Sequence, residues 1–316
     1  EFFKLYTTSS SFSEKSLDVQ RNVVIEEFKQ RYLNQPYGDV WLNLRPLAYK
    51  VHPYQWATIG KDIKHIEDAT LDDVKAFFHK WYCPNNAILT LSGNIKPEYA
   101  FKLSEKWFGE INAHDLSKES LPKEPKQNEY RNIILERDIP ANSIYKAFHT
   151  CSRFDDEFYA TELLTDILCG SKSSLLYHTL VKEQQLFNSI NAYFTGDLDN
   201  GLMVVEGKVN DGVEVKNADH AVDVLLQQVA DDGVQEKEMK IVKQKTESAL
   251  IFSEVNIGNR ALNLAYFEMI GGAEKINKQL QQYEAVNSND VQQVAKTILK
   301  KENESSIYYC KKGVTL

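Results

Sequence analysis

The sequence predicts an α+β protein with two homologous halves, each an antiparallel sheet packed against helices, and with the first half truncated. Two observations predict this class. Strand patterns follow one another and are separated from runs of helical pattern, which is typical of α+β folds. The chain also contains an internal repeat, which indicates two equivalent units of structure.

The internal repeat has a single offset. Segment 70–74 recurs as 287–291, an offset of 291 − 74 = 217. Both copies begin with a capping residue, Thr70 or Asn287, that is followed by an Asp three positions later. Two further matches share this register, 47–49 with 264–266 and 24–25 with 241–242. We therefore expect superposition of the halves to pair Val74 with Val291 and Leu47 with Leu264.

The repeat and one polar stretch divide the chain. Residues 114–129 are polar and contain two prolines, as is typical of a linker between domains. The second copy begins near Tyr130, whose counterpart would lie at 130 − 217 = −87, so roughly 88 residues of a complete first copy lie outside the sequence. We predict that 1–113 is the C-terminal part of the first half, 114–129 the linker and 130–316 the second half.

Each element is predicted from a local pattern. In the first half, a helix is expected over 16–32, another after the cap at Thr70, a strand over 87–91, and a helix over 96–111 that begins with Pro97. The second half is expected to contain strands over 132–136, 144–149, 190–195, 201–208 and 306–310. Its helices are expected over 155–168, 173–182, 216–230, 235–254, 261–270 and 288–300.

Composition argues against several classes of protein. The formal net charge of −8 argues against a nucleic-acid binder, which usually carries a basic face. No apolar run approaches the roughly 18 residues of a membrane span, so no membrane partner is expected. The four cysteines have no paired spacing, so we expect free thiols and a cytoplasmic location. The seven histidines include no pair three to five residues apart, so no helix carries a ready-made metal pair.

The helix predicted over 16–32 carries two candidate residues. Gln20 and Glu27 are seven residues apart and therefore lie on nearly the same side of the helix, two turns apart. Helix geometry alone favours a surface Glu27 that pairs with Arg31 at i+4. The resemblance described next adds a second interpretation of Glu27.

Several stretches carry a resemblance to a known family. They are 19–28 (VQRNVVIEEF), the motif His52-Pro53-Tyr54, 69–78 (ATLDDVKAFF), 82–87 (YCPNNA) and 169–174 (CGSKSS). On these residues the chain resembles the pitrilysin/insulinase family of zinc metallopeptidases, over nearly its whole length and most strongly from Leu17 to Phe108. The resemblance implies two homologous halves that close around an extended peptide.

The same resemblance implies a zinc site. In this family, two histidines of an inverted His-x-x-Glu-His helix and a downstream Glu hold zinc, and the Glu of the motif activates the metal-bound water. Glu27 matches the downstream ligand. The motif does not occur in the 316 residues, and counting back from Glu27 places it near −54 to −50. We therefore expect the complete protein to be a zinc endopeptidase, and the chain as given to bind no zinc and to be inactive.

The second half matches the non-catalytic half of the family, because 163–167, at the repeat position of the motif, contains no histidine. Three positions depart from the family pattern: Gln20 where a second Glu is usual, and Val181 and Asn188 where an Arg and a Tyr hold the substrate. We therefore expect a weak peptidase that acts on peptides or unfolded proteins together with a second, related subunit. The alternatives are a non-catalytic assembly or core subunit of the same fold, and a peptide-binding module.

Overall fold

The computed structural model describes residues 12–116 and 120–312, which form two compact units. Unit 1 is drawn from segments 1–31, 58–120 and 250–278, and unit 2 from segments 32–57, 121–249 and 279–316. This division differs from the predicted one into 1–113, 114–129 and 130–316, which stays a prediction. Among the described residues, no helix combines the length and the apolar character needed to cross a membrane.

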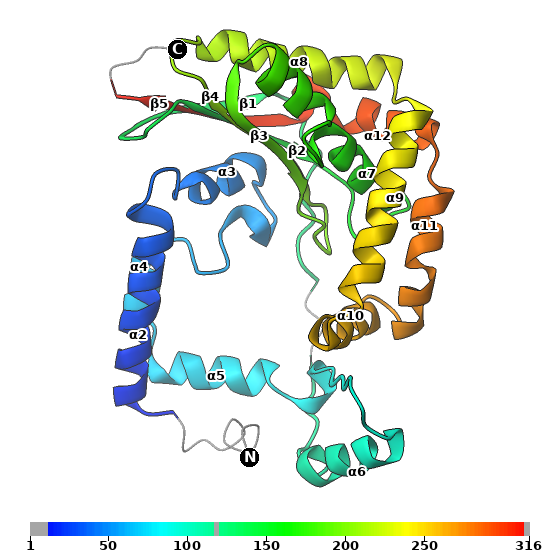
Figure 1. The fold of residues 1–316 in the computed structure, drawn as a ribbon. Helices are drawn as coiled ribbons and strands as arrows, with labels where there is room; N and C mark the ends of the chain where they lie inside the picture. The colour runs from blue at the N-terminus through cyan, green and yellow to red at the C-terminus, as the bar shows by residue number, and fades with distance from the viewer. Residues whose placement is uncertain (1–11, 117–119, 313–316) are drawn as a thin grey trace. The chain divides into compact units, whose positions relative to one another are not determined.

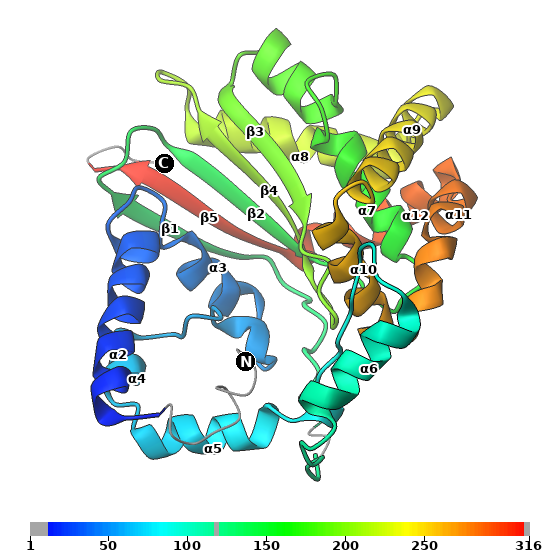
Figure 2. The ribbon, with the colours of Figure 1, turned by 60° about the horizontal axis from the view of Figure 1, so that its bottom comes forward.

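Unit 2 is built on one five-stranded sheet. The strands are β1 (Arg131–Arg137), β2 (Ser143–His149), β3 (Phe187–Phe194), β4 (Leu202–Val209) and β5 (Glu304–Lys311), in the order β1-β5-β2-β4-β3 (Figure 2). All neighbours are antiparallel except β1 and β5, which are parallel. The sheet is therefore antiparallel, as predicted, except at this one pair. Residues 138–303, which contain β2 to β4 and several helices, separate β1 from β5 and permit the parallel pairing, which a short turn would not allow.

Helices cover both faces of this sheet (Figure 1). On one face lie α7 (Phe158–Cys169), α8 (Val215–Asp232) and α12 (Ser288–Ile298), and on the other lies α3 (Val40–Ala48). In α8 the buried residues recur at helical spacing, so that one apolar stripe faces the sheet. Leu44 of α3 is fully buried in the core cluster, together with Ile307 and Tyr309 of β5. The helices α9 (Glu236–Ser253) and α11 (Gln279–Ala285) follow α8 and precede α12 in the chain.

Unit 1 is helical in the part that the structure describes. It contains α2 (Glu14–Phe28), α4 (Ile63–Glu67), α5 (Leu71–Trp81), α6 (Pro97–Phe108) and α10 (Ile257–Met269). The strand predicted over 87–91 is not formed: the structure assigns these residues no helix or strand. A strand needs a neighbour for its backbone N–H and C=O groups. The strands that the structure describes pair with one another as β1-β5-β2-β4-β3, so none of them pairs with this segment.

The repeat is visible element by element. The first residues of α3 and α10 are Val40 and Ile257, which are 217 positions apart, and α5 and α12 correspond over 71–81 and 288–298. Both of these last helices begin with the predicted capping box, formed by Thr70 with Asp73 and by Asn287 with Asp290. The residue pairs expected to correspond therefore lie in equivalent helices.

The two copies exchange one segment. Segment 32–57, which contains α3, belongs to unit 2. Its counterpart, 249–274, lies almost entirely in the segment 250–278 of unit 1, which contains α10. Each unit thus includes a helix that the repeat assigns to the other half. The sequence repeat gives no signal for this exchange, because it reports equivalence and not which sheet a helix covers.

One carboxylate fastens the polar stretch 120–129 to the exchanged segment of unit 2. The carboxyl of Glu124 accepts hydrogen bonds from the backbone N–H groups of Lys50 at 2.7 Å, Val51 at 2.8 Å and His52 at 2.8 Å. Burial alone would raise the pKa of Glu124, but the three donors outweigh it and the pKa is lowered.

Replacing Glu124 with Gln is expected to lower stability at neutral pH by about 1–2 kcal/mol, since an amide replaces the charged acceptor of three donors. The lowered pKa sets the pH dependence: the contribution is present above the ordinary value of 4.5 and is lost as the pH falls through the folded value. Thermal melts of both proteins between pH 7 and pH 3 should therefore converge at the acid end. A constant gap across this range would contradict the assignment.

Candidate functional site

Glu27 lies in the last turn of α2 and is partly exposed. Its carboxylate lies 3.0 Å from a guanidinium nitrogen of Arg31, and 42% of the Glu27 side chain is exposed. This ion pair is the i+4 contact that helix geometry favours. The backbone continues from α2 into a π-helical turn at Lys29–Leu33, a deviation that is frequent at functional sites. The role of Glu27 as a metal ligand stays a prediction.

Gln20 is exposed on α2, two turns before Glu27. The next residue, Arg21, holds α2 against the segment that joins α4 and α5. Its Nη2 donates to the carbonyl of Ala69 at 2.7 Å and its Nε to the carbonyl of Ile66 at 3.3 Å. These carbonyls lie at the end of α4 and just before α5. Arg21 therefore sets the position of the helix that carries both candidate residues.

Few potential metal ligands lie close together in the described residues. Within residues 12–116 and 120–312, no three His, Cys, Asp or Glu side chains lie close enough together to hold an ion. A catalytic zinc takes about three protein ligands, and the described residues bring none to Glu27. Zinc therefore does not fit on these residues alone, and Glu27 would need ligands from elsewhere.

Val181 and Asn188 lie at irregular points of unit 2. Val181 is in a π-helix, Tyr177–Glu183, and Asn188 sits where the pairing of β3 with β4 shifts register between Phe187 and Ser189. The loop between them is closed by the N–H of Leu186, which donates to the carbonyl of Leu180 at 2.9 Å. π-Turns and bulges often re-aim side chains near functional sites. Neither residue carries the positive charge or the phenol that the family pattern places there.

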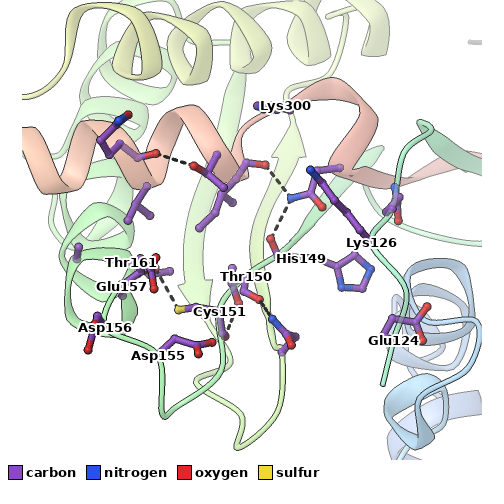
Figure 3. A pocket seen from close by; sticks show the side chains of 18 of the residues that line it. Glu124, Lys126, His149, Thr150, Cys151, Asp155, Asp156, Glu157, Thr161 and Lys300 are labelled. Carbon is purple, nitrogen blue, oxygen red and sulfur yellow. Dashed lines mark hydrogen bonds between the residues drawn. The ribbon is translucent and has the colours of Figure 1, made fainter. Parts of the chain in front are cut away.

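Unit 2 also contains a cavity of about 870 Å³ that sequence reasoning missed (Figure 3). It lies among the end of β2, the first turn of α7, one side of α12 and the segment 124–127. Carboxyl groups outnumber ammonium groups in its wall, as shown by Glu124, Asp155, Asp156, Glu157, Asp290 and Glu302 against Lys126 and Lys300. The lining residues come from 124 to 303, with no motif among them, so no sequence signal points to this cavity.

The polar groups in the cavity suit binding better than bond cleavage. Nε2 of His149 lies 3.0 Å from the carbonyl of Ala48 and must donate to it, which leaves Nδ1 as an acceptor. Burial lowers the pKa of His149 and raises the pKa of Cys151, whose Sγ lies 3.5 Å from the hydroxyl of Thr161. A neutral imidazole and a protonated thiol provide no activated nucleophile at neutral pH.

Comparisons with known proteins agree with this fold. Residues 68–246, more than half of the chain, match the family described as Peptidase M16 inactive domain. The chain is similar to zinc protease PqqE of Helicobacter pylori, with 23% identity over 313 residues that span 98% of this chain and 70% of that protein. A probable mitochondrial-processing peptidase subunit beta of Schizosaccharomyces pombe is 26% identical over 209 residues, or 62% of this chain and 45% of that protein. The crystal structure of a protease from Helicobacter pylori covers 94% of this chain and 73% of its own, with a TM-score of 0.87 and 22% identity.

Proposed function

Because the chain belongs to the M16 peptidase family, the pitrilysin/insulinase family that its sequence resembles, we propose that it is part of a zinc endopeptidase that binds extended peptides. In this proposal Glu27 is the one zinc ligand within the 316 residues, and the second half is non-catalytic. The family's two zinc-binding histidines come from a segment outside the sequence. Alone, the chain binds a peptide or an unfolded protein without cleaving it.

The asymmetry of the two copies is the observation that carries this proposal. Glu27 has Gln244 as its counterpart (27 + 217 = 244), so only the first copy has a carboxylate at this position. The part of α7 that corresponds to the zinc motif has Leu163, Leu164 and Ile167 buried in the core. That stretch of α7 therefore packs a core instead of presenting metal ligands.

A non-catalytic subunit of the same fold is the second candidate. Val181 and Asn188 favour it, because removing one donor to a developing oxyanion typically costs about a hundredfold or more in rate. The fission-yeast relative is named as a subunit, which fits a protein that works with a partner. We propose that a second, related subunit supplies the missing groups, since a homodimer would lack the same residues twice.

The test compares the chain with a version extended by its own upstream coding segment. We expect chelator-sensitive cleavage of an unfolded peptide from the extended protein only. Glu27→Ala should reduce this cleavage and the bound zinc by more than about a hundredfold, since even outer-shell changes cost 10–100-fold. Glu26→Ala is the matched control, because Glu26 is exposed and forms a surface ion pair with Lys29, at 2.8 Å.

Three results decide between the candidates. Equal activity of the Glu27→Ala and Glu26→Ala proteins would refute the ligand role of Glu27. Turnover of about 1 s⁻¹ or faster by the extended protein alone would refute the need for a second subunit. Cleavage that begins only when a paralogous subunit is added would support it.

A further inference from the structure

The cavity of unit 2 has in its wall a buried hydroxyl with no good hydrogen-bond partner. Thr150 is 5% exposed, and its hydroxyl oxygen lies 3.4 Å from the carbonyl oxygen of Cys151. Hydrogen bonds between two oxygens normally span about 2.5–3.0 Å, so this contact hardly satisfies the hydroxyl. Burying a polar group without a partner costs free energy. Thr150 therefore indicates that a polar group of a ligand completes this wall.

Other polar groups in the wall are left as hydrogen-bond acceptors. The ring of His149 has Nδ1 as an acceptor, because Nε2 donates to the carbonyl of Ala48. The side-chain amide of Asn303 donates to the carbonyls of His149 and Ile298, both at 2.9 Å. Both of its protons are used, which leaves the amide oxygen as an acceptor. A ligand that satisfies these groups must therefore bring donors.

Carboxylates at the start of α7 give one side of the cavity a negative charge (Figure 3). Asp155 accepts hydrogen bonds from the N–H and the hydroxyl of Ser152, both at 2.8 Å. Asp156 and Glu157 are exposed, and their carboxylates form no ion pair with any residue that the structure describes. Burial raises the pKa of the Cys151 thiol, and the charges of Asp155 and Glu157 raise it further. The negative charge therefore acts inside the cavity and is free to bind a cation.

Apolar side chains and the placement of the lysines narrow the ligand further. Ala160, Val294 and Ile298 line the cavity and are each 5% exposed or less. Lys126 and Lys300 lie away from the start of α7 (Figure 3). The helix dipole alone would explain acidic residues at the start of α7, but it explains neither the apolar wall nor the buried hydroxyl. The cavity thus fits a cation that carries an apolar chain.

We propose that this cavity binds an aliphatic primary amine, with its ammonium group held by Thr150, Asp156 and Glu157 and its methylene chain on the apolar wall. An ammonium group has three donors and no acceptor, which suits a wall of acceptors. A free alkylamine and the lysine side chain of a peptide share this chemistry. Neither zinc nor peptide cleavage is needed for this binding, so it stands or falls separately from the proposed peptidase function.

The experiment follows the backbone amide signals of the 316-residue chain by NMR during titration with pentylamine, and with pentanol as the uncharged counterpart. We expect saturable shifts of the amides at 149–161 with a dissociation constant of about 1 mM, which a ligand of this size can reach. A lysine tripeptide with blocked ends, compared with its norleucine analogue, tests the second source of the amine. Binding of this peptide in addition would assign the site to lysine side chains. Equal binding of pentylamine and pentanol, or no saturable binding of either amine, would overturn the proposal.

Substitutions test the named acceptors. Thr150→Val keeps the shape of the side chain and should weaken pentylamine binding about tenfold or more, because a hydrogen bond to a charged group is lost. The double variant Asp156→Asn with Glu157→Gln should weaken it as well, and both of its sites are exposed, so the fold is retained. Thr297→Val is the matched control, because Thr297 also lines the cavity but its hydroxyl donates to the carbonyl of Gln293 at 2.9 Å. Unchanged affinity in the Thr150 variant and in the double variant would overturn the assignment.

Discussion

Replacing Lys146 with Met is expected to lower the free energy of unfolding of unit 2 by about 3–5 kcal/mol, the usual result of breaking a buried ion pair. Lys146 lies in β2 and its side chain is fully buried. Its ammonium group lies 2.7 Å from Asp219, 2.5 Å from Asp223 and 3.0 Å from Glu304. Methionine fills a similar volume but leaves the buried carboxylate of Glu304 without its fully buried cationic partner.

The charge state of Lys146 is secure over the whole neutral range. Burial alone would lower the pKa of Lys146, but the three carboxylates outweigh it and the pKa is raised above its ordinary value of 10.5. A raised pKa in the folded state stabilises the protein fully below the unfolded value and loses this effect only as the pH rises through the folded one. The loss caused by Lys146→Met should therefore be the same at pH 6 and pH 8.

Lys301 provides the matched control. It contacts two of the same carboxylates, Asp223 at 3.1 Å and Glu304 at 2.9 Å, but its side chain is half exposed. Lys301→Met should cost no more than about 1 kcal/mol, because water can replace an exposed ammonium group. Denaturant unfolding followed by exchange of the β2 and β5 amides measures both variants. If the Lys146→Met and Lys301→Met proteins unfolded at the same denaturant concentration, the central role of Lys146 would be contradicted.

The sequence predicts the second half well because its elements have clear local periods. Strands 132–136 and 201–208 and helices 216–230 and 288–300 fall within about two residues of β1, β4, α8 and α12. The capping residues Thr70 and Asn287 are also confirmed, since a cap depends on only four consecutive residues. These features need no knowledge of distant parts of the chain.

The features that the sequence does not predict depend on distant partners. Segment 87–91 has the composition of a strand, yet a strand forms only beside another strand. The parallel pairing of β1 with β5 and the cavity beside α7 each join residues more than 100 positions apart. Glu27 is a different case: its helix was predicted, but a single carboxylate on a helix does not identify a metal site without the other ligands.

The exchanged helix α3 makes the second prediction with a large effect. Leu44→Ala is expected to destabilise unit 2 by about 2–5 kcal/mol, because a fully buried leucine is lost and the cavity it leaves collapses only in part. Leu44 packs in the cluster with Ala147, Ile307 and Tyr309, so the loss falls on the face of the sheet that α3 covers. Exchange of the β2 and β5 amides measures the local stability directly.

Ile257→Ala in α10 is the matched control for Leu44→Ala, because the repeat places Ile257 on the same helix face, one turn earlier. Ile257 is exposed in this chain, so its truncation should change stability by no more than about 0.5 kcal/mol. A large difference between the two variants would show that α3 packs on the sheet at Leu44, whereas α10 is not buried at Ile257. Equal, small effects would instead mean that α3 contributes little to the stability of unit 2.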